Sequence, residues 1–145
     1  LEMSTKNNKT IWEMTKANEL HNISEKELNN KLDQIWDAMR SCVESGLSTE
    51  GILPGGLNTK RRAKQLHENL QSDPENASTN DWLCAYAMAV NEENAAGHMV
   101  VTAPTNGAAG VVPAILYYYY KHKSATAEQI RQFFLTSSAI GTLRI

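Results

Sequence analysis

The chain has 145 residues, with 14 lysines and arginines against 16 aspartates and glutamates, and a net charge of −2. Its length suits one domain, and the interspersed charges argue against a nucleic-acid or membrane partner. No apolar run could span a bilayer, no signal-peptide pattern opens the chain, and the two cysteines lack a metal-ligand spacing. We therefore expect a cytoplasmic protein in which Cys42 and Cys84 pack as small buried hydrophobic groups.

The first third of the chain predicts two helices after a short polar segment. Residues 1–9 are polar, and we expect them to be a flexible N-terminal segment. Thr10 can cap the first helix, and Ser24 with Glu27 forms a capping box for a second helix that ends near Gly46. In the second helix apolar residues recur at spacings of three and four, which predicts one buried face: Leu28, Leu32, Ile35, Trp36, Met39 and Val43.

The middle third predicts a loop, a short helix, a linker and a longer helix. Residues 48–58 hold three glycines and a proline, which are typical of a loop. Thr59 can cap a short helix whose first residues are basic: Lys60, Arg61 and Arg62. The polar residues 72–79 form a linker, and Asn80 can cap a helix that runs to about Glu93.

The last third adds two helices and completes an all-α, bundle-like domain with long glycine- and proline-rich loops. An apolar helix spans about residues 112–122, and the four tyrosines at 117–120 point all round it, so at least two should be buried or at an interface. Thr126 and Gln129 form a capping box for the final helix. Residues 99–103 are the only β-like run, and a single strand has no partner.

The loop at residues 101–114 is the most informative segment. It passes through Pro104, Asn106, Gly107 and Gly110 into an apolar helix. Small residues before a helix N-terminus expose backbone N–H groups, which together with the helix dipole attract an anion. The same residues are also ordinary turn formers, and most such turns bind nothing. The spacing fits neither the phosphate-binding loop nor the dinucleotide fingerprint.

Charged residues elsewhere offer further candidates. Glu93 and Asn94 end an apolar helix a few residues before the loop. The carboxylate could orient an ammonium group there, or these residues could simply form a solvated helix end. Arg61 or Arg62 could bind a carboxylate through two parallel hydrogen bonds, or lie on a solvated face. His98 is a weaker candidate than these residues, as an acid or base. The other histidines are expected at the surface: His21, His67 and His122.

Three blocks of this sequence resemble one family when taken together. Residues 89–97 read AVNEENAAG and are followed at once by VVTAPTNG at residues 100–107. Upstream, EGILPGGL at residues 50–57 leads to RRA at residues 61–63, and IWDAMRSCV at residues 35–43 precedes both. These blocks, in this order, resemble the α domain of the iron–sulfur-dependent bacterial L-serine dehydratases, over most of the chain from about Thr10.

The resemblance implies a lyase that converts L-serine to pyruvate and ammonia, with a [4Fe–4S] cluster as the Lewis acid. It implies that residues 10–145 are part of a larger helical catalytic domain, and that a downstream helical part and a regulatory β domain are missing. It also implies a homodimer when the enzyme is complete. Glu93 becomes the catalytic candidate, and the substrate-binding candidates are Arg61, Asn94, Thr102, Thr105, Asn106, Gly107 and Ala108.

The resemblance assigns no metal ligand to this chain, because neither Cys42 nor Cys84 matches the cluster cysteines of the family. We therefore expect no cluster and no turnover from this chain alone. The alternative from a different class is a helical interaction module whose loop binds a carboxylate or a partner.

Overall fold

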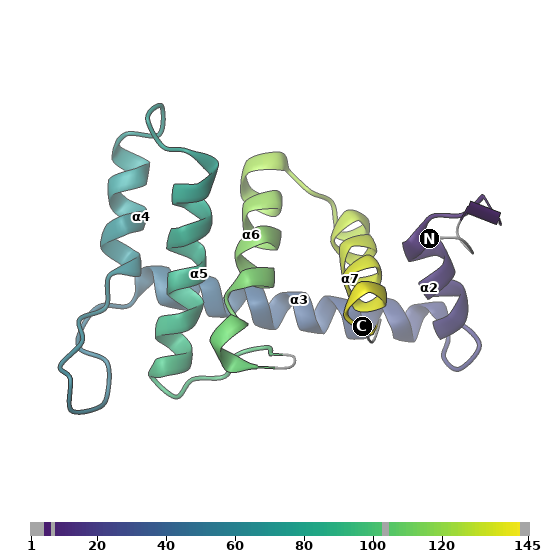
Figure 1. Ribbon diagram of the computed structural model, residues 1–145, viewed down its shortest axis with the longest axis horizontal. Coiled ribbons are helices and arrows are strands. Elements are labelled where there is room, and N and C mark those ends of the chain that lie inside the picture. Colours follow the sequence, from purple (N-terminus) through teal and green to yellow (C-terminus); the bar gives the residue numbers. More distant parts are fainter. Residues whose placement is uncertain (1–4, 7, 103–104, 143–145) are drawn as a thin grey trace. The chain divides into compact units, whose positions relative to one another are not determined.

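The computed structural model describes residues 5–6, 8–102 and 105–142, and its helices are labelled in Figure 1. The α-helices of these ranges are α2 (Ile11–Glu19), α3 (Glu25–Ser48), α4 (Ala63–Ser72), α5 (Thr79–Ala95), α6 (Val111–Lys123) and α7 (Ala127–Thr142). A single 3-10 turn, η1 (Asn106–Ala108), precedes α6. No strand occurs in the described ranges, so the all-α prediction is confirmed.

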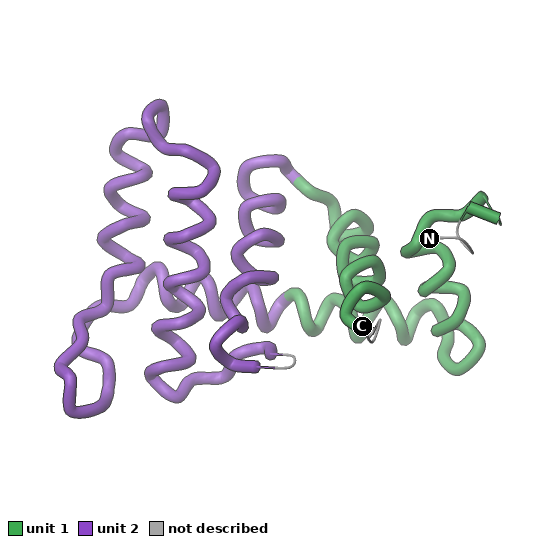
Figure 2. Tube along the Cα trace, viewed as in Figure 1, with its two compact units in different colours: residues 1–36, 125–145 green, residues 37–124 purple. Residues whose placement is uncertain are grey.

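The chain divides into two compact units (Figure 2). Unit 1 comprises residues 1–36 and 125–145, and unit 2 comprises residues 37–124. The long helix α3 therefore contributes its first half to unit 1 and its second half to unit 2. All residues discussed below as a candidate site belong to unit 2.

Unit 1 confirms the capping signals of the sequence. Thr10 and Glu13 form a complete capping box at the start of α2. The Ser24 hydroxyl accepts the backbone N–H of Glu27 at 3.2 Å, and Thr126 exchanges hydrogen bonds with Gln129 at the start of α7. Helices α2 and α7 pack against each other, and the core of the unit contains Leu28, Trp36, Ile130, Phe134 and Leu135.

The predicted apolar face of α3 is only partly correct. Leu28, Met39 and Val43 are buried, but Ile35 is 38% exposed while its neighbour Trp36 is only 8% exposed. Because one residue turns a helix by about 100°, the buried stripe passes through Trp36 rather than Ile35 at this level. The tryptophan is the larger side chain, and its burial removes more apolar surface from water.

In unit 2, α5 packs against both α4 and α6. Its buried residues include Trp82, Tyr86 and Ala89, and the second half of α3 completes the core. The approach of α3 to α5 depends on Gly46, because a Cβ atom at this position would lie 2.8 Å from the Cα atom of Ala89. The predicted start of α6 near residue 112 is also confirmed, since the helix begins at Val111 and Pro113 lies buried in its first turn.

Two predicted helix starts in unit 2 are wrong. The helix α4 begins at Ala63, so Thr59 does not cap it and the basic residues 60–62 precede it. Lys60 forms an isolated antiparallel bridge with Ile52, which holds this segment extended. The cap of α5 is Ser78, which forms a capping box with Asp81, and not Asn80.

Two predictions of burial are also corrected. Cys42 is buried, but Cys84 is exposed on α5. His67 is half-buried against the ring of Trp82. Both residues lie on helices that the sequence predicted, and the packing of neighbouring helices decided which face is covered. Among the four tyrosines, Tyr117 is buried and the other three are half-buried.

Candidate functional site

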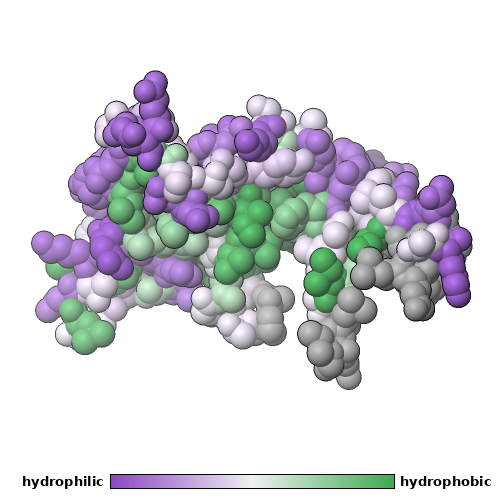
Figure 3. All heavy atoms as spheres, turned by 45° about the horizontal axis from the view of Figure 1, so that its top comes forward, coloured by the Kyte–Doolittle hydropathy of each residue, from purple (hydrophilic) through white to green (hydrophobic). Residues whose placement is uncertain are grey.

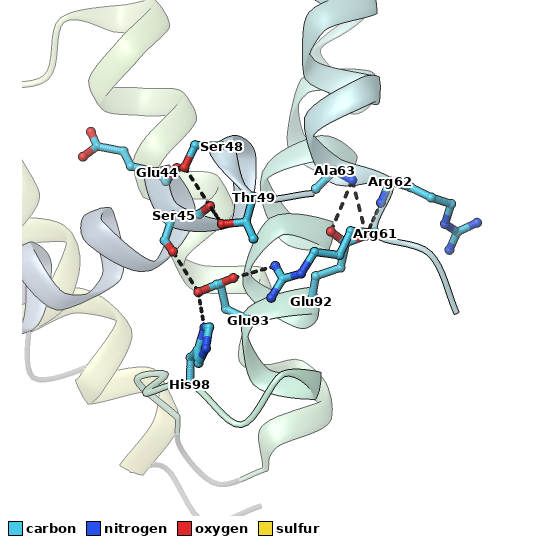
Figure 4. Close-up of polar contacts among 10 residues, drawn as sticks. All are labelled: Glu44, Ser45, Ser48, Thr49, Arg61, Arg62, Ala63, Glu92, Glu93 and His98. Atoms are coloured by element: carbon cyan, nitrogen blue, oxygen red, sulfur yellow. Dashed lines mark hydrogen bonds and ion pairs between the residues drawn. The ribbon is translucent and has the colours of Figure 1, made fainter. Parts of the chain in front are cut away.

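Glu93 is the centre of a buried polar cluster near the end of α5. Its side chain is only 3% exposed, and that of Arg61 is 6% exposed. The Arg61 guanidinium donates to Oε1 of Glu93 at 2.6 Å, and the Ser45 hydroxyl of α3 donates to Oε2 at 2.9 Å. Figure 4 shows Ser45, Arg61 and His98 converging on this one carboxylate. The cluster therefore joins residues from three separate parts of the sequence.

His98 lies on the solvent side of this cluster. Its ring is 58% exposed, and Nδ1 lies 2.7 Å from Oε2 of Glu93. The His98 backbone N–H also donates to the Glu93 carbonyl at 3.0 Å, just after α5 ends. An imidazole that meets a buried carboxylate through one nitrogen has a fixed ring orientation, which is the arrangement that acid–base histidines use.

The cluster controls the protonation of Glu93. Burial acts to raise the pKa of Glu93, but the hydrogen bonds from His98, Arg61 and Ser45 outweigh it, together with the charge of Arg61. The pKa of Glu93 consequently lies below its ordinary value, because these donors stabilise the charged form. The carboxylate is therefore ionised at neutral pH.

Arg61 reaches Glu93 because the loop before α4 folds back on itself. The carbonyl of Thr59 accepts the backbone N–H of Leu53 at 2.8 Å, and the carbonyl of Gly51 accepts that of Arg61 at 2.9 Å. Gly51 has a φ of 121°, which a residue with a side chain rarely adopts. The glycine-rich loop thus presents Arg61 to α5.

The predicted anion-binding loop is connected to this end of α5. The Asn106 side-chain amide donates to Oδ1 of Asn94 at 3.1 Å. The described candidate residues of the loop are all exposed and available to a ligand: Thr102, Thr105, Asn106, Gly107 and Ala108. Pro104 lies outside the described residues.

The two glycines of this loop differ in what surrounds them. Gly107 lies in η1 and is not among the glycines of positive φ, which are Gly51, Gly55 and Gly97. A Cβ atom on Gly107 would meet only the Thr105 hydroxyl, at 3.8 Å. Gly110, in contrast, is required for packing, because a Cβ atom there would lie 2.7 Å from the carbonyl oxygen of Ala87.

The sequence gave no signal for two residues of this region. Ser45 contacts Glu93 across 48 positions of the chain. Glu92 directly precedes Glu93 and was not singled out, although it is 5% exposed and accepts hydrogen bonds from the start of α4. Arg62, predicted as an alternative to Arg61, has an exposed side chain.

The fold and site define a helical domain organised around a buried carboxylate–guanidinium pair. The family of the serine dehydratase alpha chain matches residues 6–144, nearly the whole chain. The chain therefore belongs to the serine dehydratase alpha chain family, and the resemblance seen in the sequence is confirmed.

Three relatives illustrate the match. An L-serine dehydratase of Streptomyces coelicolor is 51% identical over 82% of this chain. The L-serine dehydratase TdcG of Escherichia coli is 44% identical over 99% of it, and an L-serine dehydratase of Haemophilus influenzae is 49% identical over 77%. The matched regions make up only 27%, 33% and 26% of these relatives, so the chain spans a third of their length or less.

No helix of the described part is long and apolar enough to cross a membrane.

Proposed function

We propose that this chain forms part of the L-serine site of a dehydratase that converts L-serine to pyruvate and ammonia. The observation that carries the proposal is the buried network of Glu93, Arg61 and His98, which lies at the same end of α5 as the exposed loop tied down by Asn106. An orienting carboxylate, the exposed imidazole of His98 and the short polar side chains of the exposed loop suit an amino-acid substrate. The names of the relatives support the same substrate.

The exposed loop would bind the carboxylate of serine. Thr105, Asn106 and the backbone N–H groups around Gly107 and Ala108 supply donors without a bulky side chain to block the approach. The bond between Asn106 and Asn94 fixes the loop against α5, so that these donors stay in place before substrate arrives. Such preorganisation lowers the cost of binding.

The Glu93 cluster would orient the groups that face the substrate. The lowered pKa of Glu93 makes this carboxylate a weak base, and its oxygens already accept three hydrogen bonds. We therefore assign Glu93 to holding Arg61 and His98, and to stabilising positive charge in the site. The exposed ring of His98 is the better placed group for moving a proton.

The iron–sulfur cluster that the family resemblance implies does not fit the thiols of this chain. Such a cluster is held by several cysteine thiolates. Cys42 is buried in α3, and burial raises the pKa of its thiol to about 11, which disfavours the thiolate. Cys84 is exposed on α5, and no group of three or more metal-binding side chains occurs among the described residues. We therefore propose that cysteines outside this chain hold any cluster, in a longer enzyme such as its relatives.

A chimera tests this proposal: the chain replaces the matching segment of the Streptomyces coelicolor relative, and pyruvate formation from L-serine is measured. We expect the chimera to form pyruvate. Asn106→Ala should lower kcat/KM by about 5- to 150-fold, the equivalent of about 1–3 kcal/mol for a donor lost from a charged partner. Asn76→Ala, which removes a surface amide that pairs with Asp73, is the matched control and should have no effect. An active chimera that is indifferent to Asn106→Ala would remove the loop from the substrate site.

A further inference from the structure

A second buried carboxylate, Glu92, lies beside Glu93 and takes no part in the cluster described above. Glu92 is only 5% exposed. Its Oε1 atom accepts the backbone N–H of Arg62 at 2.6 Å and that of Ala63 at 3.3 Å, and its Oε2 atom lies 3.4 Å from the Ala63 nitrogen. Figure 4 shows Glu92 facing the backbone of these two residues. A buried charge aimed at backbone donors calls for an explanation.

The explanation lies in how α4 begins. Its N-cap residue is Arg62, whose side chain makes no capping hydrogen bond, and its first turn contains no acidic residue. The first N–H groups of a helix have no partner within the helix, and the helix dipole favours a negative charge beside them. Glu92 provides both the acceptor and the charge from α5, 30 positions further along the chain. The helix α4 is thus capped by a residue of another helix.

This cap acts on Arg61 through the backbone. The residue directly after Arg61 is held by Glu92, and the backbone N–H of Arg61 itself donates to the carbonyl of Gly51 at 2.9 Å. Arg61 is therefore fixed on both sides, and its guanidinium meets Glu93, the next residue of α5, at 2.6 Å. Glu92 therefore holds the backbone of this short segment, and Glu93 holds the Arg61 side chain.

We infer that Glu92 is a positioning residue, which clamps the start of α4 to α5 and so holds the Arg61 guanidinium on Glu93. The inference rests on the proposed function only in treating the Arg61–Glu93 pair as part of the serine site. The positioning itself is a property of this chain and can be measured without substrate. If Glu92 merely fills space, removing it would leave Arg61 where it is.

The first test measures how fast phenylglyoxal modifies each arginine of this chain, with the adducts located by mass spectrometry. Arg61 is buried and should react slowly, whereas exposed Arg62 should react fast and serves as the internal reference. In Glu92→Ala the Arg61 rate should rise at least about fivefold, because the segment opens locally. In Glu92→Gln it should stay within about twofold of the original rate, since the amide oxygen still accepts the backbone N–H groups.

A matched control removes a different capping carboxylate of the same unit. Asp81 completes the capping box of α5 with Ser78, and Asp81→Ala should leave the Arg61 rate unchanged. An Arg61 rate in folded Glu92→Ala that stays within about twofold of the original would overturn the inference, because the clamp would then not govern Arg61.

If Glu92→Ala does not fold, hydrogen exchange of the unaltered chain decides. The amides of Arg62 and Ala63 should exchange at least about tenfold more slowly than those of Lys64 and Gln65 in the same turn, after correction for intrinsic rates. Equal rates would overturn the inference. Neither measurement involves serine, so a chimera without activity would count against the proposed function and leave this inference standing.

Discussion

Replacing Glu93 with alanine is the most direct test of the buried cluster. The Glu93 side chain is 3% exposed and that of Arg61 is 6% exposed, so the substitution leaves a buried guanidinium without its carboxylate partner. It also removes the acceptor of Ser45 and of His98. The structure therefore predicts a loss of stability much greater than that of an ordinary surface charge.

The size of the effect follows from the burial of the pair. Removing one partner of a buried ion pair typically costs about 3–5 kcal/mol, because the remaining charge is left unpaired. The same reasoning predicts strong coupling between the two residues. In the Glu93→Ala background, Arg61→Ala should cost at least about 2 kcal/mol less than it does alone, since it then removes an unpaired charge.

Urea denaturation followed by far-UV circular dichroism measures these free energies of unfolding for the single variants and the double variant. The half-buried pair of Asp33 and Arg131 is the matched control. Its side chains are 41% and 22% exposed, so Asp33→Ala should cost about 1 kcal/mol or less.

Two results would refute this reasoning. The first is a loss of less than about 1 kcal/mol for Glu93→Ala, which would mean that water reaches the cluster. The second is additivity of the Glu93 and Arg61 substitutions within about 0.5 kcal/mol, which would mean that the two side chains do not interact in solution.

Three further predictions follow from the same structure. The pKa of Glu93 is lower in the folded state than in the unfolded state, where it is about 4.3. The ionised carboxylate therefore stabilises the fold fully above the unfolded-state pKa, and this contribution is lost as the pH falls through the folded-state pKa. The stability difference between the original chain and Glu93→Gln should be flat above about pH 5 and shrink below it. Gly46→Ala should lower the free energy of unfolding by at least about 1–3 kcal/mol, because the added methyl group would overlap the α5 backbone. Gly107→Ala should leave it within about 0.5 kcal/mol, because the methyl group would meet only the Thr105 hydroxyl, at the van der Waals distance of 3.8 Å. Equal effects of the two substitutions would contradict the packing. A thiol reagent should label exposed Cys84 fast and Cys42 slowly, since burial raises the pKa of Cys42 to about 11; slow labelling of both would contradict the placement of Cys84.

The sequence by itself determined the helices and most of their starts. Capping boxes such as that of Thr126 and Gln129 are local, because donor and acceptor lie within one turn, and the structure confirms them. The all-α class follows from the same periodic and capping signals. The family was also readable from the sequence, because its blocks are contiguous runs of residues.

The start of α4 depended on tertiary structure. No local rule places a helix start at Ala63, since its cap is Glu92, which is distant in sequence. Thr59 looked like the cap because threonine is a common N-cap residue, but the bridge between Ile52 and Lys60 keeps that stretch extended. A cap that comes from another helix leaves no periodic or neighbouring signal to find.

The candidate site shows the same division. The sequence singled out Glu93, Arg61 and the loop around Asn106, and the family resemblance assigned them to one substrate site, but neither gave the contacts among them. Only the packing of α5 between α4 and α6, with α3 brought close at Gly46, places Arg61 and Ser45 on one carboxylate. Residue types and local periodicity determine which groups could do chemistry and which helix carries them. The contacts among those groups depend on side chains from distant helices, so only the tertiary structure could decide them.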